Sequence, residues 1–334
     1  MKPIMKKSPV TTDIDFEADG VHHGHLKLPH SDDRSAWGAI MTPVVMIKNG
    51  AGPTVIVTGA NHGDEYEGPV ALLNLANEIK QPEVSGRIIF VPMMNYPAFC
   101  AGKRTSPIDD GNMNRAFPGN PDGSATEKIA DYFNRVLLPL SDYVLDIHSG
   151  GRTLNFVPFA AAHVLENKQQ QSRCEAAMRA FGAPYSVMLL ELDADSMYDT
   201  AAENQGKVFV STELGGGGST SCTTNEIART GVINFCAHAG VLDRGIVIRE
   251  SVNLDMPDGD CFITSASTGL LELTADIGDT VDKGQLVARI HNIERTGVDP
   301  ILHYAPIAGV VIGRHHPGLI KPGDSLAVIG IVVD

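Results

Sequence analysis

Three side chains that suit a catalytic metal stand at or just after the ends of apolar segments. His62 and Glu65 lie three residues apart in TGANHGDEYEGPVALL (58–73), and His148 closes the apolar run YVLDIH. Two imidazoles and one carboxylate give zinc three protein ligands and leave its fourth tetrahedral position for water, as a catalytic zinc requires. Zinc lowers the pKa of that water to about 7, so hydroxide forms near neutral pH. The pattern predicts one such zinc site per chain.

Each residue also has an ordinary interpretation when it is taken alone. The H-x-x-E pattern is common by chance, and a single histidine at a strand end is more often a polar residue with a satisfied hydrogen bond. Glu213, which ends KVFVSTE before a run of glycines, could be a surface acid. Taken together, these residues favour a functional site, because ligands bind where the carboxyl ends of parallel strands meet.

Alternating strand-like and helix-like segments are expected to position these side chains. Short β-branched or apolar runs predict strands, and apolar spacing of three to four residues predicts helices. The strands are expected at 54–59, 87–95, 143–151 and 207–218, and the helices at 67–80, 126–140, 168–181 and 224–240. This order predicts an α/β fold with a mixed, mainly parallel sheet and helices on both faces. We therefore expect a catalytic domain over residues 51–244, after a β-rich lead-in over residues 1–50.

Residues 245–334 have a different pattern, with short alternating segments and Gly-Asp or Pro-Gly turns. This pattern predicts a C-terminal all-β domain. The segments GDTVDKGQLV and APIAGVV resemble the biotinyl/lipoyl fold, which implies a barrel-like arrangement. The corresponding turn reads IHNIERTG and holds no lysine for a cofactor, so no attachment is expected.

Composition limits the class of protein. The 334 residues include 40 acids and 26 Lys or Arg, a formal net charge of −14. Such a surface repels phosphate backbones, so no nucleic-acid partner is expected. No apolar run is long enough to span a membrane, and the N-terminus lacks a secretory pattern. Five scattered cysteines without a C-x-x-C pair favour reduced thiols in the cytoplasm. Homo-oligomer formation is left open.

Four motifs in order carry a family resemblance: NHGDEYEG, NMNRAFPG (112–119), LDIHSGG (145–151) and TELGGGG (212–218). Over residues 50–240 they make the chain similar to the succinylglutamate desuccinylase/aspartoacylase family, whose members are zinc enzymes with a carboxypeptidase-like fold. The resemblance implies that His62, Glu65 and His148 bind the zinc.

The same resemblance assigns roles to four further residues. It implies that Glu213 is the general base, a task suited to a carboxylate beside an attacking water. Asn114 and Arg115 match the pair that grips the substrate carboxylate, and a guanidinium suits that planar anion. Arg104 matches the residue that polarises the scissile carbonyl, although an exposed salt-bridging arginine is the alternative. Asn112 departs from the family's usual Asp-x-Asn-Arg, which puts the support of this pair in doubt.

The implied reaction is hydrolysis of a small N-acyl amino acid, with N-alpha-acetyl-L-2,4-diaminobutyrate of ectoine degradation as the expected substrate. Its second, cationic amine needs an acid, and the segment 189–202 offers candidates that the sequence cannot rank: Glu191, Asp193, Asp195 and Asp199. A metallocarboxypeptidase, a deacylase for N-acetylaspartate or N-succinylglutamate, and a non-enzymatic metal-binding protein are the alternatives.

Overall fold

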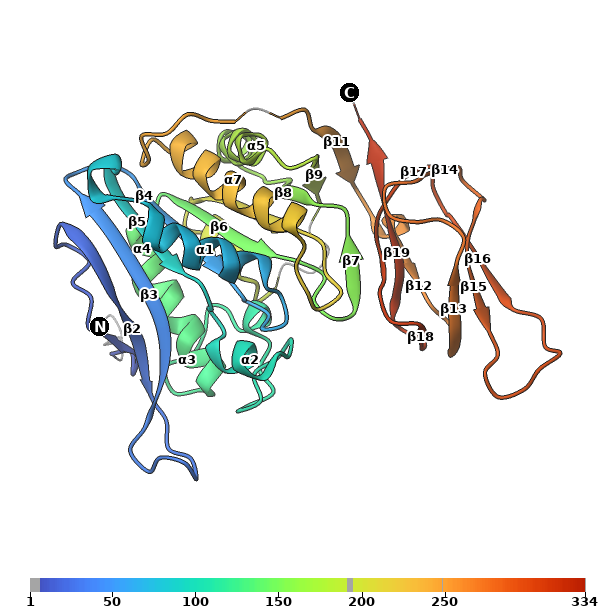
Figure 1. Cartoon of the computed structure of the whole chain (residues 1–334), viewed down its shortest axis with the longest axis horizontal. Coiled ribbons are helices and arrows are strands. Elements are labelled where there is room, and N and C mark those ends of the chain that lie inside the picture. The colour runs from blue at the N-terminus through green and yellow to red at the C-terminus, as the bar shows by residue number, and fades with distance from the viewer. Residues whose placement is uncertain (1–6, 191–194, 248, 334) are drawn as a thin grey trace.

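A mixed sheet runs through the molecule, with helices on both faces of its N-terminal part and mainly strands in its C-terminal part (Figure 1). The computed structural model describes residues 7–190, 195–247 and 249–333. The α-helices are α1 Glu67–Glu78, α2 Tyr96–Ala101, α3 Ala125–Tyr132, α4 Leu138–Leu140, α5 Lys168–Phe181, α6 Tyr198–Glu203 and α7 Cys222–His238. Shorter turns are the 3-10 helices η1 Gln81–Glu83, η2 Met113–Arg115 and η4 Gly259–Cys261, and the π-helix η3 Phe133–Leu137.

The part of the sheet that carries the site has the strand order β2-β3-β5-β4-β6-β10-β8-β9. These strands are β2 Gly20–Pro29, β3 Ala39–Asn49, β4 Thr54–Gly59, β5 Gly86–Val91, β6 Tyr143–His148, β8 Phe159–His163, β9 Tyr185–Leu189 and β10 Val208–Glu213, and the two-residue β1 Thr11–Thr12 borders β2. The neighbours β5, β4, β6 and β10 run parallel, whereas β3 and β8 pair antiparallel with β5 and β10. The β-rich lead-in is thus part of the catalytic sheet.

Two separate apolar cores hold the helices against the sheet. Residues of α1, α5 and α7 pack with one face of the strands, and residues of α3, η3, α4 and α6 pack with the other. Strands covered on both faces must be apolar throughout, as the wholly buried TVIVTG of β4 is. The expected helices on both faces of a mixed sheet are confirmed.

Local structure differs from the sequence expectation in several places, including the helix over residues 126–140 and the strands β8 and β9. The helix expected over residues 126–140 is interrupted by the π-helix η3, which precedes Pro139 of α4. Strand β8 was not predicted, because its sequence FAAAH is rich in alanine, which has low strand propensity. It forms because β10 and β9 pair with it on either side and bury every residue.

The C-terminal part is a continuation of the catalytic sheet joined to a second, smaller sheet. Its strands are β11 Val252–Met256, β12 Phe262–Thr264, β13 Gly269–Leu273, β14 Thr280–Val281, β15 Leu286–His291, β16 Ile301–Tyr304, β17 Gly309–His315, β18 Leu319–Ile320 and β19 Ser325–Val332. Strand β11 pairs with β9 and with β19, and the small β7 Leu154–Phe156 pairs with β17. The second sheet has the order β16-β15-β13-β18.

The barrel-like expectation for this C-terminal part needs correction. In the described part of the chain the strands form two open sheets and no closed barrel. The reason is that β19 pairs with both β11 and β17, so the ladder extends the catalytic sheet instead of closing on itself.

Two further expectations concern the state of the cysteines and membrane-spanning helices. All five cysteines are free thiols, as expected. No helix within the described residues has the length and apolar content needed to cross a lipid bilayer.

Candidate metal centre and active site

Neighbouring parallel strands bring the predicted residues to one edge of the sheet. His62 and Glu65 lie in the loop between β4 and α1, and His148 is the last residue of β6. Glu213 is the last residue of β10 and stands directly beside His148 in the parallel register. Strand β6 pairs with β4 on its other side, so the three strand ends are adjacent.

The loop that carries His62 and Glu65 packs tightly on α2. A Cβ atom at Gly63 would lie 2.0 Å from the carbonyl carbon of Ala98. Only glycine allows that approach, because the atom in conflict belongs to the backbone and cannot rotate away. The spacing of His62 and Glu65 therefore depends on the glycine between them.

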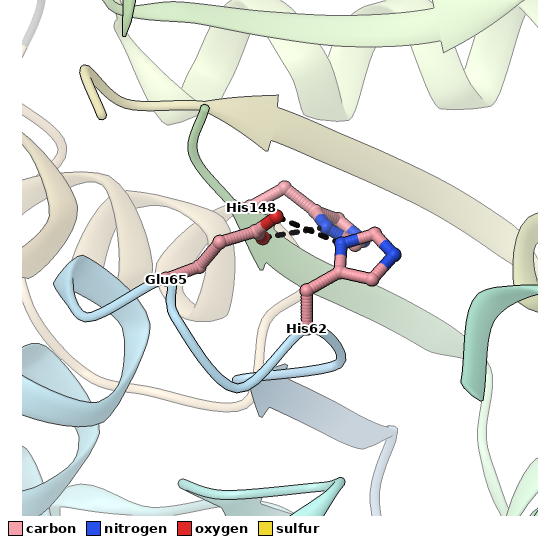
Figure 2. A group of neighbouring side chains, drawn as sticks. All are labelled: His62, Glu65 and His148. Carbon is pink, nitrogen blue, oxygen red and sulfur yellow. Dashed lines mark hydrogen bonds and ion pairs between the residues drawn. The ribbon is translucent and has the colours of Figure 1, made fainter. Parts of the chain in front are cut away.

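Figure 2 shows the Glu65 carboxylate pointing at both imidazole rings. Glu65 Oε1 lies 2.7 Å from His62 Nδ1, and Glu65 Oε2 lies 2.9 Å from His148 Nδ1. All three residues are buried, and each offers one ligand atom within 4.8 Å of the others. The described residues contain no other such group of three. The residues predicted to bind the metal therefore meet in space.

Asp146 holds the ring of His148 from its far side. Asp146 Oδ2 lies 2.8 Å from His148 Nε2 and also accepts a hydrogen bond from Asn61 Nδ2, while Oδ1 accepts one from Thr58 Oγ1 at 2.6 Å. An acid in this position accepts the Nε2 proton and leaves the Nδ1 lone pair directed at Glu65. This contact sets both the tautomer and the orientation of His148.

The arrangement fits a cation. If His148 is neutral and its Nε2–H donates to Asp146, then its Nδ1 lone pair faces the Glu65 carboxylate. These two acceptors lie 2.9 Å apart, which is repulsive unless a positive charge lies between them. Burial opposes the charged form of His148, but Asp146 and Glu65 outweigh it and raise the pKa of His148 well above its usual range. Burial also favours the neutral form of Glu65, yet the two histidines lower its pKa. The residues present thus attract positive charge and fit a divalent metal.

Glu213 faces the same space without a partner. Its Oε2 atom is buried and has no hydrogen bond to any described residue. Burial, and then the charge of Glu65, raise the pKa of Glu213 to about 8. A bound metal would counter both influences, because its positive charge favours the ionised carboxylate.

Three predicted residues come from the segment between α2 and α3. Arg104 Nη1 lies 3.4 Å from Glu65 Oε1, although half of its side chain is exposed. Asn114 is buried, and Asn61 Nδ2 donates to its Oδ1 at 3.2 Å. Arg115 is exposed, and its Nη1 donates to the Asn114 carbonyl. Asn112 caps this turn by accepting from the Asn114 N–H, so the departure from Asp leaves that contact intact.

One cavity of about 480 Å³ joins these groups. His62, His148, Arg104, Asn114, Arg115 and Glu213 all line it. The cavity also has an apolar wall, part of which comes from the C-terminal strands through Met256, Phe262, Ile312 and Val328. A volume of this size suits a small molecule.

Sequence reasoning missed several residues of this site. Asp146 left a signal, because it is an acid inside an apolar strand and lies two residues before His148, hence on the same face of β6. His163 also lines the cavity and was missed, whereas Asp199, which lines it too, was one of the four acids that the sequence offered for the substrate amine. His163 Nδ1 contacts Glu203, a pair separated by 40 residues that local spacing could not reveal.

Fold and site together define an α/β protein with a candidate metal centre at the carboxyl edge of its sheet. A family model of the succinylglutamate desuccinylase/aspartoacylase catalytic domain matches residues 51–239. N-alpha-acetyl-L-2,4-diaminobutyric acid deacetylase of Halomonas elongata is 53% identical over 331 residues, which are 98% of this chain and 97% of that protein. The chain belongs to the succinylglutamate desuccinylase/aspartoacylase family, and the expected resemblance is confirmed.

Two solved structures are also closely similar. The product-bound ectoine utilization protein EutE (DoeB) of Ruegeria pomeroyi is 59% identical, with a TM-score of 0.96 over 98% of this chain and 100% of that chain. A succinylglutamate desuccinylase of Silicibacter sp. TM1040 is 57% identical, with a TM-score of 0.96 and the same coverage. These matches confirm the expectation of a hydrolase of this family.

Proposed function

We propose that this protein is a zinc-dependent deacetylase that hydrolyses N-alpha-acetyl-L-2,4-diaminobutyrate to 2,4-diaminobutyrate and acetate in ectoine degradation. The observation that carries the proposal is that His62, Glu65 and His148 meet, and that both histidines line one small cavity together with Glu213. The Halomonas relative, named for this reaction, supports the substrate.

Zinc would be held by His62, Glu65 and His148, one ion per chain, with Asp146 orienting His148. When bound, zinc supplies Lewis-acid chemistry that polarises the acyl carbonyl and makes water a nucleophile near neutral pH. Two histidines and one carboxylate are a common catalytic zinc set. The catalytic groups all come from residues 51–244, and residues 245–334 form a β-rich part that extends the catalytic sheet and contributes apolar residues to the cavity lining.

Substrate binding falls to the segment between α2 and α3. Arg115 and Asn114 bind the α-carboxylate, with the guanidinium giving charge-assisted hydrogen bonds. Arg104, whose Nη1 lies 3.4 Å from Glu65 Oε1, is close enough to the ligand cluster to stabilise the negative charge that forms on the acyl carbonyl oxygen.

Glu213 moves the proton. Its carboxylate accepts a proton from the attacking water and delivers it to the nitrogen as the amide C–N bond breaks. Its partly buried position and the free Oε2 atom leave it available for this task. Acetate and the free amine then leave the cavity.

A desuccinylase activity is the second candidate, because a structure 57% identical to this chain carries that name. The substrates would differ in their acyl groups, since succinyl adds a second carboxylate to the cavity. A metallocarboxypeptidase would instead have to admit a peptide into the cavity of about 480 Å³. Cytoplasmic location and homo-oligomer formation remain predictions.

One assay tests the proposal. Purified protein of known metal content is given N-alpha-acetyl-L-2,4-diaminobutyrate, N-acetylaspartate, N-succinylglutamate and a blocked dipeptide, with His148→Ala as the metal-free control. We expect about one zinc per chain, fastest release of acetate from the first compound, and loss of both metal and activity in the variant. Faster turnover of another compound would overturn the proposed substrate. A zinc-loaded protein that is inactive on all four compounds would be a metal-binding protein without enzymatic activity.

A further inference from the structure

We propose that Asp199 is the specificity-determining residue that binds the cationic side-chain amine of the substrate. The inference rests on the proposed function, because only a diamino acid keeps a positive amine once its α-amine is acetylated. N-alpha-acetyl-L-2,4-diaminobutyrate carries one carboxylate and one ammonium group. The site must therefore hold charges of both signs at separate positions.

Asp199 lies in the first turn of α6, lines the cavity and is only 6% exposed. Its Oδ1 accepts hydrogen bonds from the backbone N–H and the hydroxyl of Thr200. Its Oδ2 makes no hydrogen bond or ion pair with any described residue. A carboxylate that is nine-tenths buried at the cavity wall, with one oxygen that has no protein partner, is placed to bind a cationic group.

The other acidic residues that line the cavity in the described chain already have hydrogen-bond partners or a role in the reaction. Both oxygens of Asp146 are occupied by Thr58, Asn61 and His148. Glu213 stands next to His148 and carries the proton of the reaction. Asp199 is therefore the acid that remains for an ammonium group among the described lining residues.

Its placement relative to the carboxylate-binding pair is set by a direct contact. The backbone N–H of Tyr198 donates to Asn114 Oδ1 at 3.4 Å, so the start of α6 is joined to the turn that carries Asn114 and Arg115. Asp199 thus lies next to the position of the substrate α-carboxylate. The side-chain ammonium of 2,4-diaminobutyrate lies only a few bonds from that carboxylate, which makes this neighbourhood the one it can reach.

The remaining acids of the segment 189–202 do not compete in the described structure. Asp195 is exposed and does not line the cavity. Glu191 and Asp193, which the sequence also offered, lie outside the described residues.

The experiment compares N-alpha-acetyl-L-2,4-diaminobutyrate with N-acetyl-L-norvaline, in which a methyl group replaces the ammonium. For Asp199→Asn in the zinc-loaded protein, we expect kcat/KM for the diamino substrate to fall about 10- to 100-fold, and that for N-acetylnorvaline to stay within about threefold. The exposed Asp195→Asn is the matched control and should leave both values unchanged.

Several outcomes would overturn the assignment. An equal loss on both substrates would give Asp199 a structural role, and an unchanged ratio would exclude it from the amine site. Asp199→Ser keeps an oxygen for the Thr200 N–H, so failure of both variants to fold would also make Asp199 structural. Wild-type protein inactive on the diamino substrate but active on another would instead reject the proposed function itself.

Discussion

The carboxyl edge of the β4, β6 and β10 strands and the C-terminal strands line the same cavity with opposite chemistry. The edge supplies buried histidines and acids, whereas Met256, Phe262, Ile312 and Val328 supply an apolar wall. Buried polar groups at the edge are held by mutual contacts, as in the Asp146–His148 pair. The residues of the apolar wall need no such polar partners and act on a substrate through the shape of the cavity. We infer that the edge sets the reaction and that the wall sets the size of the substrate.

The largest effect is expected at Glu213. Glu213→Gln keeps the size of the side chain but cannot accept a proton, so kcat should fall about 100- to 10,000-fold. Zinc content, measured by atomic absorption, should stay near that of the wild type, because Glu213 is not one of the three ligands. The same substitution at the exposed Glu226 serves as the control. Full activity of Glu213→Gln would assign the proton transfer to another group.

A smaller effect is expected at Asp146. Asp146→Asn removes the acceptor charge behind His148, and the affinity for zinc should fall about 10- to 100-fold. Because the ligands remain, added zinc should restore much of the activity. Competition with a chromogenic chelator measures the affinity. An unchanged affinity would show that Asn61 and Thr58 suffice to hold the ring.

The apolar wall can be tested at Phe262. Phe262→Ala should widen the cavity and raise the ratio of kcat/KM for an N-butyryl substrate over the N-acetyl substrate about 10-fold. Zinc affinity should not change. Leu270→Ala, an exposed apolar residue on β13 away from the cavity, is the matched control. If both variants keep the wild-type ratio, the C-terminal strands do not select the acyl group.

The last prediction concerns stability without metal. The folded pKa of Glu213, raised from 4.5 to about 8, means that the native state holds a proton which the unfolded chain loses first. This contribution to stability is complete below pH 4.5 and is lost as the pH rises to about 8, by at most roughly 1.4 kcal/mol per pH unit.

Glu213→Gln cannot ionise, so the metal-free variant should gain stability relative to the metal-free wild type as the pH rises across this window. Urea unfolding of both proteins at several pH values measures the difference. A constant difference from pH 5 to pH 8.5 would contradict the raised pKa.

Local pattern predicted much of the fold and the metal cluster. The apolar runs identified β4, β6 and β10, and the polar residues after them identified His62, Glu65, His148 and Glu213, because a parallel sheet collects such residues at one edge. Strand β8 escaped prediction because its burial between two strands, and not its alanines, makes it a strand. The open C-terminal sheets were not predicted, because turn residues do not indicate which strands far apart in the sequence pair with each other.

What the sequence determined by itself was the set of chemical groups and the strand ends that carry them, since periodicity and turn residues act over a few positions. Only the tertiary structure decided which oxygen faces which nitrogen. The Asp146 contact, the approach of Arg104 to Glu65, the place of Asp199 and the apolar wall all join segments far apart in the chain or fix side-chain directions. Those relations depend on strand order and packing, which no local spacing encodes.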